Sequence, residues 1–499
     1  MDLQFHKDTC QCLDRVVCEV QTGEQTQELR LNEGMPDIGR VLAAWGQPIL
    51  RSKEWRGTSI LVSGGILMWV LYAPEDGTEA RCVDSWIPVQ FQLELPQEYP
   101  QGQLRVQLLP RFSDARSISA RKLLLRSGVS ALIQGYSPRE ETLWSVREIP
   151  QDVQLLRKTY PMRLYREMGE KTFQLDEELI LPGSAPAPEK IIYHSLRPEI
   201  TDQKVMSDKV VFRGNGNLHI LYRSEEGQLH SWDFDLPLSQ YSSLDGSYDE
   251  SAQADVMLCP TGVELEMNDE GHFYLKCGMA AQYLVDNRQM VEAVADGYAP
   301  GRSLQLRTQP LSLPVVLETR HETVSPEQLL PASMNLAADL VFLPEHPRIY
   351  PMGDCVRMEL PGVFQALYYD ENGSLQGASG RWQGMKELPA QEGIQVSAVP
   401  LTGVQTQMSL AEGAVTLRTE LPLDIRSTAL QEIPMVTAIE LGQGQEPDPT
   451  RPSLILRRAS SDGLWPMAKE CGSTVEAICR ANGLEGDPQP GQMLLIPVM

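Results

Sequence analysis

Apolar runs separated by short turn signals recur along the chain and predict β-strands. Three of these runs are rich in aliphatic residues and end in a tyrosine; they span 66–72, 218–222 and 363–368. Each is followed by a turn with a glycine after an acidic residue or an asparagine, at Gly77, Gly227 and Gly373. Because glycine adopts positive φ without steric cost, such turns indicate hairpins. A strand, turn and strand unit is therefore predicted three times.

A different spacing occurs ahead of the first run. Ile38, Val41, Leu42 and Trp45 fall at i, i+3, i+4 and i+7, and Pro36 precedes them. This spacing places the four side chains on one face of a helix with proline near its first turn. A short amphipathic helix is predicted over 36–45, with a copy over about 186–196.

The chain repeats itself at a constant spacing, which decides the fold class. The tetrapeptide at 28–31, Glu-Leu-Arg-Leu, returns at 178–181 as Glu-Leu-Ile-Leu, an offset of 150 residues. The run ending in Tyr72 and the later segment 125–129 return at the same offset. A third, looser copy places Tyr368 146 residues after Tyr222. Three successive β-rich units are predicted.

The last 50 residues follow another pattern. Leu464, Met467, Ala468 and Cys471 form the stripe of one helix, and Val475, Ile478 and Cys479 form that of a second. Thr474 is placed to cap the second helix and Gly483 to end it, while 454–456 and 494–496 supply short strands. A βααβ module is predicted. A linker rich in proline and glycine, 442–452, precedes it and is expected to let it move.

Composition narrows the class of protein. The 43 basic and 67 acidic residues give a formal charge of −24, which weighs against nucleic acid as a partner. At 42% hydrophobic and 22% charged residues, the chain is neither a disordered nor a membrane type. No window approaches the ~20 apolar residues of a spanning helix, and the first residues lack the layout of a signal peptide. The protein is expected to stay inside the cell that makes it.

The nine cysteines are scattered, and reduced thiols are the default interpretation. Cys10, Cys12 and Cys18 are the only cluster. A Cys-x-Cys pair near a terminus suits a metal or a cross-link between chains, but the alternation of this segment also fits a plain strand in which cysteine is a small apolar residue. Both interpretations stay open at this point.

No set of residues points to catalysis or to a cofactor. The seven histidines include no pair at metal spacing, and His219 and His230 are interpreted as strand histidines with satisfied hydrogen bonds. No phosphate-binding loop of the ATPase type occurs, and the glycines of 214–217 are interpreted as a turn or bulge. Six acidic residues lie at Asp233, Asp235, Asp245, Asp249, Glu250 and Asp255. Their spacing does not match a calcium loop, which favours a solvated face. The chain is expected not to be an enzyme.

One stretch is basic in this acidic chain. Between 105 and 126 stand Arg105, Arg111, Arg116, Arg121, Lys122 and Arg126 against Asp114 alone, and Arg157, Lys158, Arg163 and Arg166 follow. A face of this kind suits an anionic partner or a phospholipid surface through its local potential. The alternative is a set of strand arginines that point outward without a partner.

Residues 35–42, the strand ending in Tyr72 and the segment 85–89, Ser-Trp-Ile-Pro-Val, resemble the SPOCS domain of spore-coat proteins. The resemblance implies three SPOCS-like, sandwich-like repeats. Their expected bounds are 1–160, 161–310 and a divergent 311–441. The expected fold class is mainly β, with a small α+β domain at the end.

The segments 464–484 and 490–497 resemble a LysM domain, which the resemblance bounds at 453–499 after the 442–452 linker. LysM domains grip N-acetylglucosamine chains between the loop after the first strand and the loop before the second. The candidate groove residues that carry over are Asp462, Gly463, Leu464, Gly483, Leu484 and Pro490. The usual entry motif is reordered here as Ser461-Asp462-Gly463-Leu464-Trp465, which favours a protein ligand over a glycan. The alternative for Leu464 and Trp465 is that both pack in the core, and the loops rather than Trp465 are expected to form the partner surface.

SPOCS repeats followed by one LysM domain resemble the SipL-like spore morphogenetic proteins, which are related in role to SpoVID. The resemblance implies a non-enzymatic scaffold for spore coat assembly in the mother-cell cytoplasm, at the outer forespore membrane. Its expected partner is the coat basement-layer ATPase, contacted through the LysM domain; N-acetylglucosamine polymers and the forespore membrane surface are further candidates. The alternative is a peptidoglycan-binding cell-wall protein.

Overall fold

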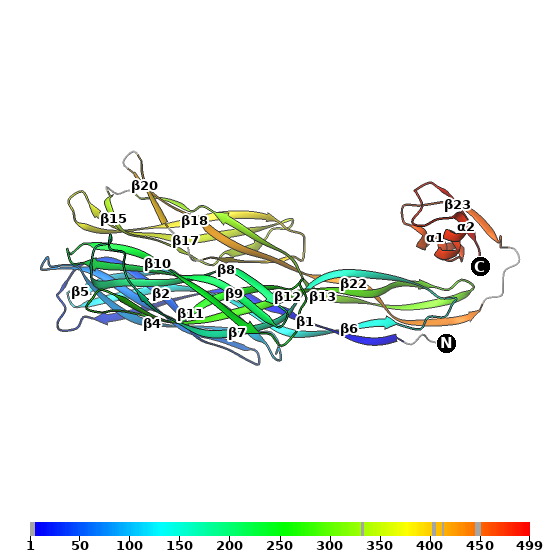
Figure 1. Cartoon of the computed structure of the whole chain (residues 1–499), viewed down its shortest axis with the longest axis horizontal. Helices are drawn as coiled ribbons and strands as arrows, with labels where there is room; N and C mark the ends of the chain where they lie inside the picture. The colour runs from blue at the N-terminus through cyan, green and yellow to red at the C-terminus, as the bar shows by residue number, and fades with distance from the viewer. Residues whose placement is uncertain (1–4, 331–333, 402–405, 412–413, 445–450) are drawn as a thin grey trace.

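The computed structural model describes residues 5–330, 334–401, 406–411, 414–444 and 451–499. The described residues form strands β1 to β24 and helices α1 and α2, so the prediction of a mainly β fold is confirmed. The molecule is elongated, with a broad body of strands at one end and a thin stalk at the other (Figure 1).

The first segment, 5–146, is a sandwich of two antiparallel sheets. One sheet has the order β1 (Phe5–Arg30), β6 (Lys122–Val146), β5 (Gln103–Ser119). The other has the order β2 (Ile38–Arg56), β3 (Ser59–Pro74), β4 (Arg81–Glu94). Inward-facing residues such as Val62, Met68, Val106 and Ile133 fill the space between the sheets. Alternate residues of each strand supply this core because successive side chains point to opposite faces.

The second segment, 154–298, repeats this order of pairing. Its sheets are β7 (Gln154–Leu179), β12 (Phe273–Tyr298), β11 (Gln253–Met267), and β8 (Pro188–Met206), β9 (Lys209–Ser224), β10 (Leu229–Ser243). In both segments the first strand pairs with the last and the last with the fifth. Phe212, Leu218, Phe273 and Val285 belong to its core.

The third segment, 302–444, has the same layout with its long strands broken into shorter ones. One side holds β13 (Arg302–Val324), β22 (Leu421–Gly444) and β19 (Gln395–Pro400), continued by β14 (Glu327–Leu330), β21 (Ala414–Thr419) and β20 (Thr406–Ala411). The other holds β15 (Met334–Pro344), β16 (Arg348–Pro351), β17 (Cys355–Asp370) and β18 (Leu375–Pro389). The three predicted hairpin turns are confirmed, since Gly77, Gly227 and Gly373 all have positive φ.

The predicted helix over 36–45 and its copy over 186–196 are wrong, because both segments are strands, β2 and β8. Within these segments each strand carries two bulges at matching places, after Ile38 and Val41 in β2 and after Pro188 and Ile191 in β8. A bulge inserts an extra residue and shifts the inward and outward alternation. Apolar residues then recur at three- and four-residue intervals that imitate a helix.

Residues 214–217 are not a turn either, because they lie inside the continuous strand β9. The irregularity is on the facing strand, where β8 bulges between Ile200 and Asp202. A Cβ at Gly214 would lie 2.1 Å from the carbonyl oxygen of Glu199. The equivalent Gly64 would meet the carbonyl oxygen of Ile49 at 2.4 Å. Glycine is therefore required where the bulged backbone approaches the central strand.

The strand pattern moves the expected segment boundaries. The limits after residues 160 and 310 fall inside β7 and β13, whereas the chain leaves one sandwich for the next at 147–153 and 299–301. Of the expected linker 442–452, Gly442–Gly444 end β22, and 445–450 lie outside the described residues.

Three ribbons extend from the sandwiches and pack together as the stalk (Figure 1). They are the ends of β1 and β6, of β7 and β12, and of β13 and β22, closing at the pairs Phe5 with Val146, Gln154 with Tyr298 and Arg302 with Gly444. Cys10 and Cys12 are buried in the stalk core among Leu164, Leu313 and Ile433. Burial raises the pKa of both thiols, that of Cys12 to about 12, so they act as small apolar core residues. Cys18 is exposed, and all nine cysteines are free.

The C-terminal module, 451–499, has the predicted order of elements. These are β23 (Leu454–Arg458), α1 (Leu464–Cys471), α2 (Val475–Asn482) and β24 (Met493–Pro497), with β23 and β24 antiparallel. The amide of Ala477 donates to the Thr474 hydroxyl at 3.1 Å, and Gly483 ends α2 at a φ of 62°. Both caps are therefore confirmed. Neither described helix is long and apolar enough to span a membrane.

Candidate functional site

The predicted groove residues belong to two neighbouring loops of the module. Asp462 and Gly463 precede α1, whereas Gly483, Leu484 and Pro490 lie between α2 and β24. The loops are adjacent, since a Cβ at Gly463 would lie 3.8 Å from the Asp487 carboxylate. Asp462, Gly483 and Pro490 are exposed, and Leu484 is half-buried.

Leu464 differs from the other predicted groove residues. Its side chain is only 3% exposed and packs with Met467, Ile478 and Ile496 in the module core. Leu464 therefore fixes the start of α1 and offers a ligand no side-chain surface. The contact surface of the loops comes from the residues around it.

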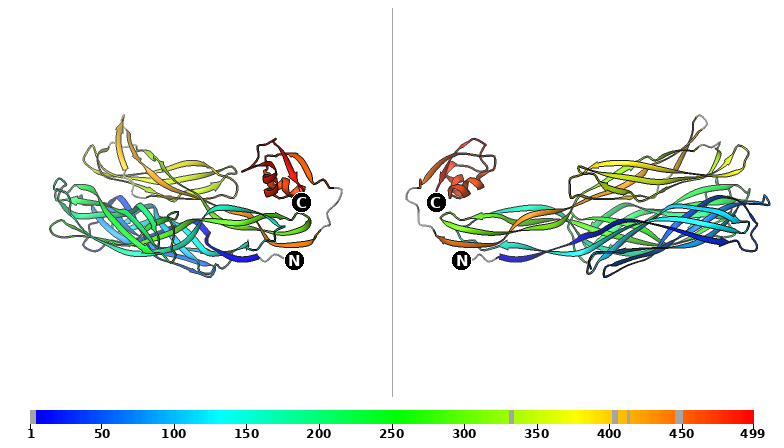
Figure 2. Two further views of the ribbon diagram at one scale, coloured as in Figure 1. Left: turned by 45° about the vertical axis from the view of Figure 1, so that its right-hand side comes forward. Right: turned by 180° about the vertical axis from the view of Figure 1, so that it is seen from behind.

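Trp465 forms a contact that the sequence did not predict. Its indole Nε1 donates to Asp296 Oδ2 at 2.9 Å, and its ring lies edge-on to Tyr298, with centroids 4.9 Å apart. Lys469, one turn later on α1, donates to both oxygens of Asp296 at 2.7 and 2.8 Å. The alternative in which Trp465 packs in the module core is thus only partly right, because one side of the half-buried indole meets the stalk. The module is docked on the end of β12 (Figure 2).

Asp296 is positioned for this contact by the backbone of β12. A bulge between Val294 and Asp296 changes the alternation of the strand just before its end, which turns the Asp296 side chain toward the module. Burial acts against the carboxylate, but the hydrogen bonds from Lys469 and Trp465 lower the pKa of Asp296 below its usual value. Asp296 thus stays ionised at neutral pH and paired with a lysine.

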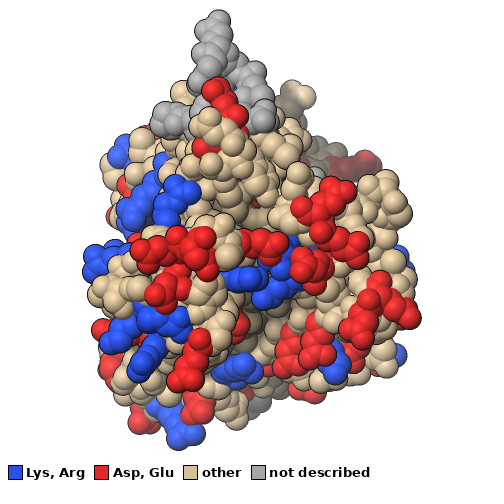
Figure 3. Space-filling view, turned by 90° about the vertical axis from the view of Figure 1, so that its left-hand side faces the viewer, with Lys and Arg blue, Asp and Glu red and all other residues tan. Residues whose placement is uncertain are grey.

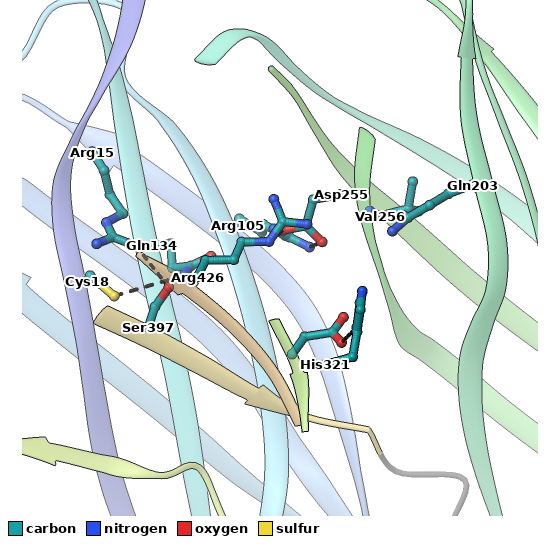
Figure 4. Close-up of polar contacts among 11 residues, drawn as sticks. Arg15, Cys18, Arg105, Gln134, Gln203, Asp255, Val256, His321, Ser397 and Arg426 are labelled. Atoms are coloured by element: carbon teal, nitrogen blue, oxygen red, sulfur yellow. Dashed lines mark hydrogen bonds and ion pairs between the residues drawn. The ribbon is translucent and has the colours of Figure 1, made fainter. Parts of the chain in front are cut away.

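A cluster of buried charges joins the three sandwiches (Figure 4). Arg105 of β5 makes two hydrogen bonds to Asp255 of β11, and Arg426 of β22 reaches the same carboxylate at 3.1 Å. Arg105 and Asp255 stand 150 residues apart, at the same position of equivalent strands. Burial disfavours the carboxylate, yet the two guanidinium groups hold the pKa of Asp255 well below its usual range.

A cavity of about 430 Å³ lies beside this cluster. Residues from all three segments line it, including Tyr136, Gln203, His321 and Arg426. His321 Nδ1 lies 2.6 Å from Asp424 Oδ1, and Glu199 and Asp202 add two further carboxylates to the cavity wall. Across the described part of the chain, no group of three or more His, Cys, Asp and Glu residues is placed to hold a metal ion. The arrangement suits a structural junction between the segments.

The acidic residues between 233 and 255 do not converge. Asp233 lies 2.7 Å from His219 Nδ1, and His219 Nε2 lies 2.8 Å from Asp339 of the third segment. Burial would lower the pKa of His219, but the two carboxylates raise it to about 9. His219 is therefore a buried imidazolium that links the second and third segments.

Most of the basic stretch is paired with acids. Arg111 reaches Glu345 at 2.8 Å, Arg121 reaches Asp37 at 3.0 Å, and Arg126 reaches Glu24 at 2.7 Å. Lys122 with Glu28, Arg157 with Glu292 and Arg163 with Asp286 form further pairs. Arg116 and Lys158 are exposed, and Arg166 donates to the carbonyl of Gln11. On the end of the body remote from the module, basic and acidic side chains are intermixed (Figure 3). These pairs favour the interpretation as ordinary strand faces, and a membrane contact stays a prediction.

Strands β8 to β11 belong to the second sandwich, and comparison with known families matches this part of the chain. Residues 188–267 match the SipL family, SPOCS domain. The matched range begins with the first residue of β8 and ends with the last residue of β11. The SPOCS match supports a SipL-like family and a sporulation-related protein. No curated protein and no solved structure is significantly similar to the chain.

Proposed function

We propose that the protein is a non-enzymatic adaptor of spore coat assembly. In this proposal it works in the mother-cell cytoplasm, at the outer forespore membrane, and recruits or anchors the coat basement-layer ATPase through its C-terminal module. The SPOCS match at 188–267 supports the link to sporulation. The membership of the module in the LysM family stays a prediction, carried by the order of its elements and its caps.

The observation that carries the proposal is the position of the module. It stands at the end of the stalk, well away from the three sandwiches (Figure 1). A binding module held in this way can reach one partner while the body contacts another surface. The buried charges of the body also support a non-enzymatic role. Arg105, Asp255 and Arg426 pair with one another between the segments.

The proposal is tested in sporulating cells that produce either the full chain or a chain ending at residue 452. We expect the truncated chain to leave the ATPase unlocalised and coat assembly defective. A matched full-length variant, Glu476→Gln on the exposed side of α2, should behave as the wild type. Normal ATPase localisation without 453–499 would refute the proposal.

A second candidate function is binding of peptidoglycan through N-acetylglucosamine. The adjacency of the loops that hold Gly463 and Asp487 favours it, since this is where the LysM resemblance places the glycan groove. Sedimentation with insoluble peptidoglycan distinguishes the two functions. Retention of the full chain, lost in an Asp462→Ala and Pro490→Ala variant, would favour the wall-binding alternative.

A further inference from the structure

The two-stranded sheet of the module exposes one apolar face. Leu454 and Leu456 of β23 are 56% and 62% exposed, and Met493 and Leu495 of β24 are 47% and 44% exposed. Leu456 pairs directly with Leu495, so these side chains stand together on one side of the sheet. The opposite side carries Leu494 and Ile496, which are fully buried in the core. Four large exposed side chains on one face exceed what packing of so small a module explains.

Among the described residues, β23 pairs only with β24, so no described strand pairs with its outer edge. Asn482 of α2 binds both backbone groups of Leu495, accepting from its N–H at 2.8 Å and donating to its C=O at 2.6 Å. Leu456 and Leu495 are therefore a non-hydrogen-bonded pair of the antiparallel ladder, in which both residues direct their backbone groups away from each other. The N–H and C=O of Leu456 point to the free edge, and those of Leu454 do so by the two-residue repeat.

A basic residue flanks this edge. Arg458 follows Leu456 by two residues and lies on the same face, opposite Met493. It is exposed, and among the described residues it has no acidic partner, whereas the neighbouring Arg457 is paired with Glu470 at 2.6 Å. The face therefore combines apolar side chains, unpaired backbone groups and one free positive charge.

Docking of the module leaves this surface free. The stalk contacts the module through Asp296 and Tyr298, which meet Trp465 and Lys469 of α1. Leu454, Leu456 and Leu495 keep their large exposure in the docked arrangement.

We infer that the edge of β23 and the apolar face beside it form the partner-binding surface of the module. Its occupant is an extended segment of a protein partner that adds a third strand along β23. The segment places apolar side chains beside Leu454 and Leu456 and an acidic residue near Arg458. Strand addition of this kind draws affinity from main-chain hydrogen bonds and specificity from alternate side chains. The inference rests on the proposed function, since it names the face that meets the coat basement-layer ATPase.

The test measures binding of the purified ATPase to the full-length chain and its variants. Leu456→Pro removes the outward N–H while the bonds between β23 and β24 stay in place, and Arg458→Glu reverses the flanking charge. We expect each variant to weaken binding by about tenfold or more. Glu476→Gln, on α2, should bind within about twofold of the wild type. Asp462→Ala, in the loop before α1, tests the loops as the rival binding surface. Thermal unfolding and limited proteolysis check that each variant keeps the module folded.

The outcomes separate this inference from the proposed function. If Leu456→Pro and Arg458→Glu bind normally while truncation at residue 452 abolishes binding, the β23 surface is wrong and the proposed function stands. If truncation also leaves binding unchanged, both are wrong. Loss of binding in Asp462→Ala alone would place the partner in the loops and overturn the inference.

Discussion

The side-chain amide of Gln282 in the second segment binds the backbone of Val106 in the first as a strand residue would. It donates to the Val106 carbonyl at 2.7 Å and accepts from the Val106 N–H at 2.8 Å. Gln282 is fully buried, and Lys53 donates to its carbonyl oxygen at 2.6 Å. A side chain thus satisfies backbone groups of β5 where one sandwich meets the next.

Replacing Gln282 by leucine should destabilise the protein. The substitution leaves the buried N–H and C=O of Val106 without partners, and each unsatisfied group costs about 1–3 kcal/mol. We expect a loss of roughly 2–5 kcal/mol in the free energy of unfolding of the body, measured by urea denaturation. Gln92→Leu, at an exposed position of β4, serves as the control. Equal stability of the two variants would show that the amide contact contributes little.

The buried cluster predicts a non-additive pair of substitutions. Arg105→Met removes two hydrogen bonds to Asp255 and leaves the buried carboxylate beside Arg426, which should cost about 3 kcal/mol or more. The double variant Arg105→Met with Asp255→Leu removes the stranded carboxylate as well. Its loss in free energy of unfolding should be smaller than the sum of the losses of the two single variants, by about 1 kcal/mol or more. Strict additivity in a double-mutant cycle would contradict the coupling.

Asp296→Ala should release the C-terminal module from the stalk. The variant removes the acceptor of both Trp465 and Lys469. We expect a larger maximum dimension in small-angle X-ray scattering, with unchanged unfolding of the body. Glu292→Gln, on the same strand but paired with Arg157, is the matched control. Unaltered scattering in Asp296→Ala would mean that other contacts hold the module.

His346 should make the protein less stable in acid. Its Nε2 lies 3.1 Å from Gln107 Oε1 and its Nδ1 lies 2.8 Å from the Ser130 hydroxyl, an arrangement that fits the neutral ring with its proton on Nε2. Burial lowers the pKa of His346 from 6.5 to about 3. The unfolded chain therefore binds an extra proton below pH 6.5, and stability falls as the pH drops from there, by up to about 1.4 kcal/mol per pH unit. His346→Gln should reduce this slope in urea titrations between pH 6.5 and 4.5; an identical slope would contradict the assignment.

His219 should change the stability with pH in the opposite direction to His346, and it serves as the internal comparison. Because its folded pKa is raised to about 9, its contribution is fully present below pH 6.5 and is lost as the pH rises through 9. His219→Gln should flatten the alkaline side of the profile and leave the acid side unchanged.

Local sequence patterns predicted the repeated β-units and the helices of the C-terminal module. The offset of 150 residues and the glycine turns indicated repeated β-units, and the stripe from Leu464 to Cys471 indicated the first helix of the module. The same reasoning gave a wrong helix at the bulges after Ile38 and Val41. The bulges change the spacing of inward-facing residues, and no sequence signal there distinguishes a strand from a helix. Residue spacing therefore predicts regular strands and helices but not bulged strands.

Contacts between distant segments had no local signal. Gln282 and Val106 are 176 residues apart, and Trp465 and Asp296 are 169 apart. Arg105 and Asp255 occupy matching positions of two repeats, so the constant offset could have placed them together as a complementary pair. The exposed face of Leu454, Leu456 and Leu495 could also have been predicted. Residues 454–456 and 493–496 are apolar at every position, and a small core cannot bury both faces of the two strands.

Co-purification from sporulating cells tests the central claim most directly. Tagged full-length chain and tagged chain ending at residue 452 are isolated in parallel, and the coat basement-layer ATPase in each is quantified. The adaptor account predicts that the ATPase accompanies the full chain and is lost with residues 453–499. Equal recovery of the ATPase with both chains would contradict it.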